Sequence, residues 1–232
     1  MLHDLAIASL LLAAASAMII AGDLIRHPQQ MWIMDLVWPV TALFGSLAVI
    51  CLYFTFGRAT RAHPGAKPDE QPAPFAIMVT KGTLHCGAGC MLGDLCAEWL
   101  AFAAPGVAVW AGWQWLFGEK MFAVWVLDYA FAYVLGVLFQ YFTIAPMRGL
   151  SFRDGLIAAV KADTISITAW QIGMYGFMAA ARFYIFPHSP RMTSQTDSAE
   201  FWFMMQIAMI LGFFTAYPAN WWLLRIGVKE RM

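Results

Sequence analysis

The stretch Thr80-Lys-Gly-Thr-Leu-His-Cys-Gly-Ala-Gly-Cys-Met-Leu-Gly-Asp-Leu-Cys-Ala-Glu98 decides how the rest of the chain is interpreted. It lies in an apolar run over 75–104, which is long enough to cross a membrane as a helix. At about 100° per residue, its small residues form one stripe that lets a second helix approach closely: Gly82, Cys86, Gly89, Cys90, Gly93 and Ala97. The same stretch carries thiols, an imidazole and acids, which hydrocarbon tolerates only when they face protein or water. Packing alone does not require this combination.

The composition is that of a membrane protein. The 232 residues are 61% hydrophobic and 12% charged, with a mean hydropathy of +0.64. A soluble domain would carry roughly twice that share of charged residues. The formal net charge of zero, with no basic patch interleaved with aromatics, excludes nucleic acid as a partner. The sequence therefore predicts an all-α integral membrane protein whose surroundings are the lipid bilayer.

Six apolar segments are long enough to cross the bilayer. We expect these spans at 2–25, 31–56, 75–104, 121–145, 163–186 and 200–226. Between the fourth and fifth spans, apolar residues alternate with charged ones over 147–161, which predicts a short amphipathic helix on the membrane surface.

A change of composition divides the chain. Residues 58–74 are rich in Arg, Lys, Gly, Pro and acids, which is typical of a linker. We therefore expect a two-helix N-terminal hairpin over 1–57, a cytoplasmic linker over 58–74 and a four-helix core over 75–232. The core holds nearly all the unusual polar residues.

The basic residues orient the six expected spans. One side would carry Arg58, Arg61, Lys67, Arg148, Arg153, Lys161, Arg225, Lys229 and Arg231. The other side would carry Arg26, Lys120, Arg182 and Arg191. By the positive-inside rule, this bias predicts a multi-pass protein of a bacterial inner membrane with both termini in the cytoplasm.

Cys86 and Cys90 are the strongest candidates for a metal site. One helical turn separates them, so their Cβ atoms lie about 5–6 Å apart, whereas a disulfide needs about 3.8 Å. Two reduced thiols with His85 beside them suit a soft cation such as Cu(I) or Zn(II). The alternative is that each cysteine simply packs as a small apolar residue in a tight helix seam. Asp94 is a candidate proton or ion relay at the edge of the same face.

The fifth and sixth expected spans carry further candidates. Asp163, Gln171, Met174 and Met178 fall on one side of the fifth span. In the sixth span, Met205 and Met209 lie one turn apart near the outer face. Thioethers favour Cu(I) over hard ions. The alternatives are helix-to-helix hydrogen bonding for the polar groups and lipid-phase packing for the methionines.

An acid also lies within the fourth expected span. Asp128 needs a partner in the membrane, for which we expect Arg182 or Gln171. A structural ion pair and a place in an ion relay are equally good explanations of this residue.

Three motifs together resemble a known family. They are His85-Cys-Gly-Ala-Gly-Cys90 with Gly93, then Tyr141-Phe-Thr-Ile-Ala-Pro-Met-Arg-Gly-Leu150, then Lys161-Ala-Asp-Thr with Thr168-Ala-Trp-Gln-Ile-Gly-Met174. They resemble an uncharacterised family of bacterial membrane proteins, domain of unknown function 4396, over residues 75 to 230. The resemblance implies a polytopic membrane protein whose genes are often associated with copper handling. It implies no catalytic residues, and we assign none and do not class the chain as an enzyme.

Our leading hypothesis is a protein that binds Cu(I) for transport or for delivery to another membrane protein. Cys86 and Cys90 would be thiolate ligands near the bilayer midplane, with the four methionines as a relay toward the outer face. His85 and Asp163 would lie on the cytoplasmic side of the thiols. A copper chaperone, a copper enzyme or a second copy of the chain would be the protein partner. No Gly-x-x-x-x-Gly-Lys-Ser/Thr motif is present, so the energy would come from a gradient or from ligand exchange.

Two other functions stay open. One is a membrane redox protein that uses thiols with a quinone, or haem. The Cys-x-x-x-Cys spacing differs from the usual Cys-x-x-Cys redox centre, and His85 is the only histidine well inside an expected span. The other is a structural subunit in which the cysteines only pack.

Overall fold

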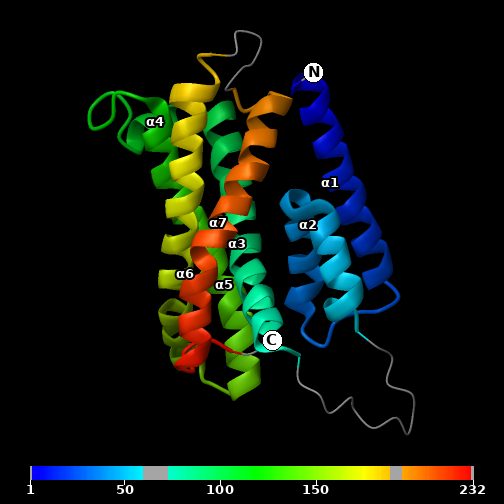
Figure 1. The fold of residues 1–232 in the computed structure, drawn as a ribbon. Helices are drawn as coiled ribbons and strands as arrows, with labels where there is room; N and C mark the ends of the chain where they lie inside the picture. The colour runs from blue at the N-terminus through cyan, green and yellow to red at the C-terminus, as the bar shows by residue number, and fades with distance from the viewer. Residues whose placement is uncertain (1, 60–72, 189–194, 231–232) are drawn as a thin grey trace, which may run out of the picture.

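The computed structural model describes residues 2–59, 73–188 and 195–230, and the regular elements in these ranges are helices (Figure 1). They are α1 (Leu2–Leu24), α2 (Trp32–Leu52) with the π-helical turn η1 (Tyr53–Gly57), α3 (Phe75–Ala103), α4 (Gly106–Trp110), α5 (Lys120–Arg148), α6 (Phe152–Ala180) with the π-helical turn η2 (Ala181–Ile185), and α7 (Ala199–Arg225). The expected all-α class is confirmed.

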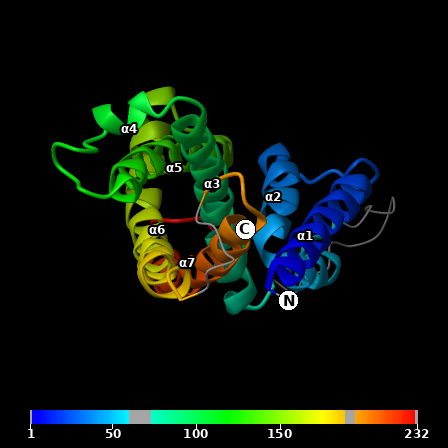
Figure 2. The same cartoon turned by 90° about the horizontal axis from the view of Figure 1, so that it is seen from above.

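Four long helices form the core of the molecule. Helices α3, α5, α6 and α7 lie side by side, and α1 and α2 pack against the α3 and α7 side of this group (Figures 1 and 2). By length and composition, five segments can cross a membrane: α1, α2 with η1, α3, α5 and α7. The chain thus has the composition of a multi-pass membrane protein.

The surface helix expected over 147–161 is not a separate element. Helix α5 continues to Arg148 and ends at Gly149, whose φ of 60° is the left-handed conformation that closes many helices. Helix α6 then begins at Phe152, and the Ser151 side chain caps it by accepting a hydrogen bond from the Asp154 amide. From there α6 runs unbroken to Ala180, so the amphipathic residues form its first turns. The expected fifth span therefore begins about three turns earlier than its apolar residues indicate.

Helix α2 does not follow the straight path expected of a second span. It reverses at Ser46, whose backbone has φ 42° and ψ −122°. The Trp38 and Tyr53 rings pack edge to face on either side of the reversal, with centroids 5.4 Å apart. Helix α2 and η1 are therefore a hairpin whose two arms lie side by side (Figure 1).

One acid closes the base of this hairpin. Asp23, at the end of α1, accepts hydrogen bonds from the Tyr53 hydroxyl (2.8 Å) and from Arg58 (2.7 and 2.9 Å). These bonds raise the pKa of the Arg58 guanidinium, which keeps its charge in any case.

The tip of the hairpin is held by α7. The Gln206 side chain donates a hydrogen bond to the Leu43 carbonyl (2.7 Å) and accepts one from Ser9 of α1 (2.7 Å). A backbone group at membrane depth needs such a partner because hydrocarbon offers none. Gln206 thus joins α1, α2 and α7.

The reversal changes the topology. The two chain ends lie at opposite ends of the bundle, with the described N-terminal residues beside the α4 end (Figure 1). The expectation of six straight spans with both termini on one side is therefore not confirmed by the described residues. Most of the linker expected at 58–74 lies outside the described residues, so the proposed domain boundaries stay a prediction.

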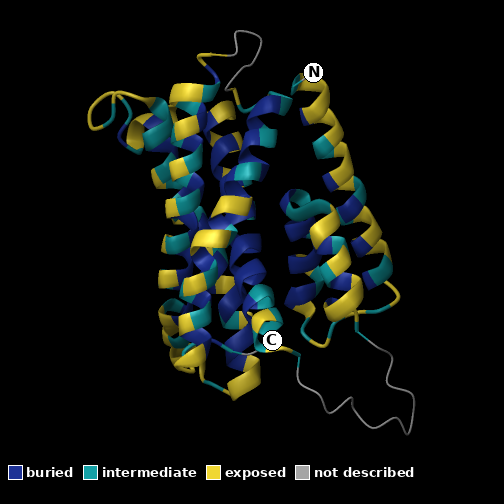
Figure 3. Cartoon of the chain, viewed as in Figure 1, coloured by how far each residue is buried: buried dark blue, intermediate teal, exposed yellow. Residues whose placement is uncertain are grey.

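Burial divides the core helices into two faces. Their outward faces expose large apolar side chains, including Val134, Leu138, Ile172 and Phe214, while their inward faces are buried (Figure 3). Polar and ionisable residues also lie on the inward faces. A polar interior in an apolar exterior is typical of a site within a membrane bundle.

Candidate functional site

The small-residue stripe of α3 is the seam between α3 and α5. A Cβ atom added to Gly89 would lie 2.9 Å from the Gly136 Cα, and one added to Gly93 would collide with the Ala132 backbone. The two backbones therefore touch, which is the close approach that small residues permit. This contact fixes the rotation of α3 and turns its thiols toward α6.

Cys86 and Cys90 lie in the centre of the core as free thiols. Both side chains are fully buried, and they interact with each other. The Cys86 thiol also contacts the Asp163 carboxylate of α6. Cys96, by contrast, is on the exposed side of α3. The structure thus separates the thiol pair from the third cysteine of the helix.

His85 packs against α5, with its ring centroid 5.9 Å from that of Phe139. Its Nε2 lies 3.0 Å from the Thr143 hydroxyl, and that hydroxyl donates its proton to the Phe139 carbonyl (3.1 Å). In the tautomer that fits this arrangement, the imidazole donates from Nε2 and leaves a lone pair on Nδ1. Nδ1 is buried and has no hydrogen-bond partner among the described residues. A neutral histidine held in this way can accept a proton or a metal ion.

The four candidate methionines are buried in the same core cluster as the two thiols. They come from two helices that pack together: Met174 and Met178 from α6, and Met205 and Met209 from α7. The sulfur-bearing residues therefore lie on three helices of one cluster.

Asp94 and Asp128 are buried acids whose carboxylate oxygens have no hydrogen-bond partner in the described part of the chain. Gln171 is close enough to Asp94 to interact, but neither side chain makes a well-formed hydrogen bond. Arg182, one of the two partners expected for Asp128, does not pair with it. Arg182 instead pairs with Glu119 (3.3 Å) near the surface.

Glu98 extends this group of acids toward a cavity. It is one turn beyond Asp94 on α3, and its charge acts on Asp94 and Asp128. Its carboxylate accepts a hydrogen bond from Thr196 (3.1 Å). A cavity of about 450 Å³ opens at this end of the bundle, and its walls include Glu98, Lys120 and Met178. Of Asp94, Asp128 and Glu98, Glu98 is the acid that lines this cavity.

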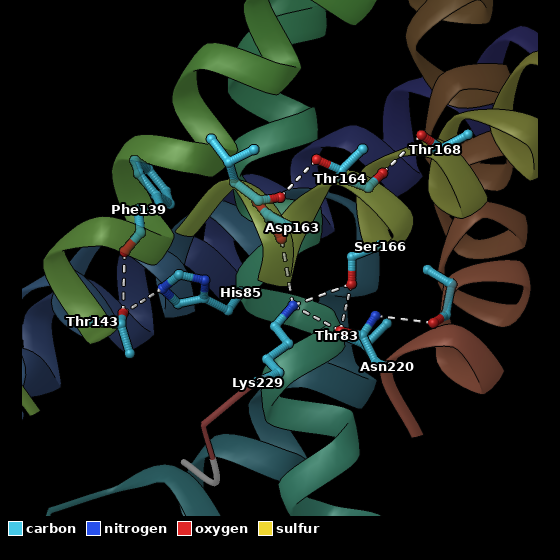
Figure 4. Close-up of polar contacts among 12 residues, drawn as sticks. Thr83, His85, Phe139, Thr143, Asp163, Thr164, Ser166, Thr168, Asn220 and Lys229 are labelled. Carbon is cyan, nitrogen blue, oxygen red and sulfur yellow. Dashed lines mark hydrogen bonds and ion pairs between the residues drawn. The ribbon is translucent and has the colours of Figure 1, made fainter. Parts of the chain in front are cut away.

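The opposite end of the core is closed by a lysine. The Lys229 ammonium lies 2.7 Å from the Asn220 amide oxygen, 3.2 Å from the Ser166 hydroxyl and 3.5 Å from the Asp163 carboxylate (Figure 4). The Lys229 side chain is fully buried. Asp163 therefore contacts a thiol of α3 and an ammonium from beyond α7.

Two of these residues, Glu98 and Lys229, were not predicted from the sequence as site residues. Glu98 follows Asp94 by one helical turn, and this spacing could have placed it on the same face. Lys229 was counted only as a surface charge. No sequence signal places it in the core, because its position depends on a reversal of the chain after α7.

A search for conventional metal sites adds one constraint. The described residues contain no group of three or more His, Cys, Asp or Glu side chains that could hold a metal ion.

Comparisons with known proteins give one match. No curated protein and no solved structure matches the chain. A family model matches residues 77–229, which cover α3 to α7 and the Lys229 tail. The chain therefore belongs to the family described as Domain of unknown function (DUF4396).

Proposed function

We propose that this protein binds a soft metal ion, Cu(I), in the core of α3, α6 and α7 and carries it through the membrane or delivers it within the membrane. The observation that carries the proposal is the burial of the Cys86 and Cys90 free thiols in the same large apolar core as four methionines of α6 and α7. Thiolates and thioethers are the side chains that select Cu(I). The unpartnered Nδ1 of His85, the residue before Cys86, would add a nitrogen ligand or a proton acceptor in the same core.

The cavity provides the entry to this site. Met178 lies in its wall and Met174 lies one turn deeper on α6, so thioethers lead from the cavity toward the thiols. Binding of Cu(I) by two thiols forms two Cu–S bonds and releases two protons. Asp94, Asp128 and Glu98 are buried near this path and could take up those protons, with Gln171 between them.

The charges orient the molecule in the plasma membrane of a bacterium. The Lys229 end carries Arg26, Arg58, Arg148, Arg153, Arg225 and Lys229, whereas the α4 end carries Lys120 and Arg182. The positive-inside rule then places the Lys229 end in the cytoplasm and the α4 cavity outside. In this arrangement α1, α3, α5, α6 and α7 cross the membrane and the α2 hairpin does not.

Copper titration of cysteine variants tests the proposal. The protein is purified anaerobically in detergent, its metal content is measured, and Cu(I) is titrated against a competing chelator. Cys86→Ala should abolish tight binding, because one thiolate with thioethers holds the ion weakly. Cys96→Ala is the matched control, because this cysteine is in the same helix and outside the cluster.

Each outcome separates the candidate functions. If Cys86→Ala binds copper as tightly as the parent, the thiols only pack and a structural subunit becomes the better interpretation. A Soret band in the protein before copper is added would instead identify a haem protein.

A further inference from the structure

The Lys229 ammonium occupies a ready-made group of oxygen atoms inside the core. The group consists of the Asn220 amide oxygen, the Ser166 hydroxyl and the Asp163 carboxylate, all fully buried. Three oxygens satisfy the three donors of the ammonium. Oxygen atoms of these same types are also the ligands of hard metal cations.

The oxygens are held in place by the core and not by the lysine. The Asn220 amide nitrogen donates to the Ala216 carbonyl (2.9 Å), which turns the amide oxygen toward the site. The Ser166 hydroxyl donates to that oxygen (2.6 Å), so its own lone pairs face the ammonium. Because both orientations are set within α6 and α7, the site would persist without Lys229.

One carboxylate oxygen of Asp163 does not bond to the Lys229 ammonium. Its second carboxylate oxygen, Oδ2, is buried and has no hydrogen-bond partner among the described residues. A Cβ atom on Gly136 of α5 would lie 2.5 Å from this oxygen, so only glycine leaves room for it there. The carboxylate is therefore packed firmly between α5 and the Lys229 ammonium.

The lysine reaches the site from a tail outside the helices. Gly227, with φ 73°, reverses the chain after α7, and the Val228 and Lys229 amides bond back to the Leu223 carbonyl. Arg148 of α5 holds the tail on both sides by pairing with Glu230 and by donating to the Gly227 carbonyl (3.2 Å). The ammonium is thus attached to a short segment that could move without unwinding a core helix.

We propose that Asp163, Ser166 and Asn220 form a binding site for a small monovalent inorganic cation, Na⁺ or K⁺, and that Lys229 is its tethered substitute. The site holds one carboxylate and therefore balances one positive charge. A divalent ion would leave an unpaired charge in the core, which is costly. This inference involves oxygen ligands only, and its test uses no copper.

Replacement of Lys229 by methionine tests the site. Lys229→Met keeps the aliphatic stem and removes only the ammonium, which leaves a space the size of a small ion. The full-length variant in detergent should bind one ²²Na⁺ or ⁸⁶Rb⁺ per chain, while the parent should bind neither above background. Its thermal unfolding midpoint should rise in NaCl or KCl relative to choline chloride at equal ionic strength. The Na⁺ and K⁺ arms identify which cation fits.

The Lys229→Met/Asp163→Asn double variant is the control. It lacks the carboxylate and should lose both the ion binding and the salt-specific stabilisation. If Lys229→Met binds no cation and responds equally to all three salts, the site is only a partner for the lysine and the proposal fails. Equal binding by the parent would overturn the role given to Lys229. If Lys229→Met does not fold, a chain that ends at Gly227 removes the same ammonium and takes the same tests.

Discussion

Trp38 and Tyr53 face each other across a reversal in what looks by composition like one transmembrane helix. Their ring centroids are 5.4 Å apart, whereas a straight helix would separate the two residues by roughly 22 Å. The contact makes α2 a hairpin that returns to the side from which it entered. It predicts that the residues before α2 lie on the side of the membrane opposite to the one that six straight spans would give them.

Labelling of single cysteines can test this topology. Arg26→Cys and Gly118→Cys, each in a background with Cys51 and Cys96 replaced by serine, should react with a membrane-impermeant maleimide from opposite sides. Arg26 is at the hairpin end of α1, and Gly118 is in the open loop at the α4 end. Six straight spans would put both positions outside. Labelling of both variants in intact cells would thus contradict the hairpin.

Ser46 is strained at the hairpin tip, and its replacement should show this. A positive φ is unfavourable for any residue with a Cβ atom, and φ 42° with ψ −122° is a conformation that favours glycine. Ser46→Gly should raise the free energy of unfolding by about 1 kcal/mol, and Ser46→Val should lower it by at least as much. Unfolding in mixed micelles, followed by tryptophan fluorescence, measures both. Equal stabilities would mean that Ser46 is not under strain.

The α3 and α5 seam should be intolerant of a single methyl group. Gly93→Ala would force its Cβ atom into the Ala132 backbone, which cannot move aside as a side chain can. We expect a loss of about 1–3 kcal/mol in the free energy of unfolding. Gly176→Ala on the exposed face of α6 is the matched control, because nothing lies within 4 Å of the added atom. The control should leave stability unchanged or slightly higher.

Two buried aspartates should respond in opposite ways to the same isosteric change. Asp163→Asn leaves the Lys229 ammonium buried without a charge partner, which should cost about 3–5 kcal/mol. Asp128→Asn removes a carboxylate that has no hydrogen-bond partner among the described residues, so stability should not fall. Unfolding of both variants at one pH gives the comparison. A large loss in Asp128→Asn would reveal a partner for that acid.

Much of the fold could be predicted because the length and apolar composition of a membrane helix identify it in the sequence. The four core helices were expected within a few residues, apart from the first turns of α6. Those turns were assigned to a surface helix because Arg153, Asp154 and Lys161 lower the local hydropathy. The hairpin was not predicted because its sequence is as apolar as a span. Its reversal depends on one serine and on a glutamine of α7.

The site could be predicted only where helical spacing brings residues together. The spacing of Cys86 and Cys90 and the stripe on α6 led to residues that are buried in one cluster. Lys229 reaches the core through a turn after α7, and no helical period covers such a turn. Hydrogen-bond partners across helices, such as Ser166 with Asn220, depend on rotations that one helix alone does not specify.

The bond between Gln206 and Leu43 has a consequence for the order of biogenesis. The ribosome delivers the hairpin tip early, but its partner belongs to the last helix to be made. Glu200 likewise reaches back to His3, 2.7 Å away at the start of the chain. Until α7 is inserted, the hairpin tip has an exposed carbonyl at membrane depth. The N-terminal segment thus gains its last hydrogen-bond partners only from the C-terminal helix. A chain truncated before α7 should therefore be degraded by membrane proteases.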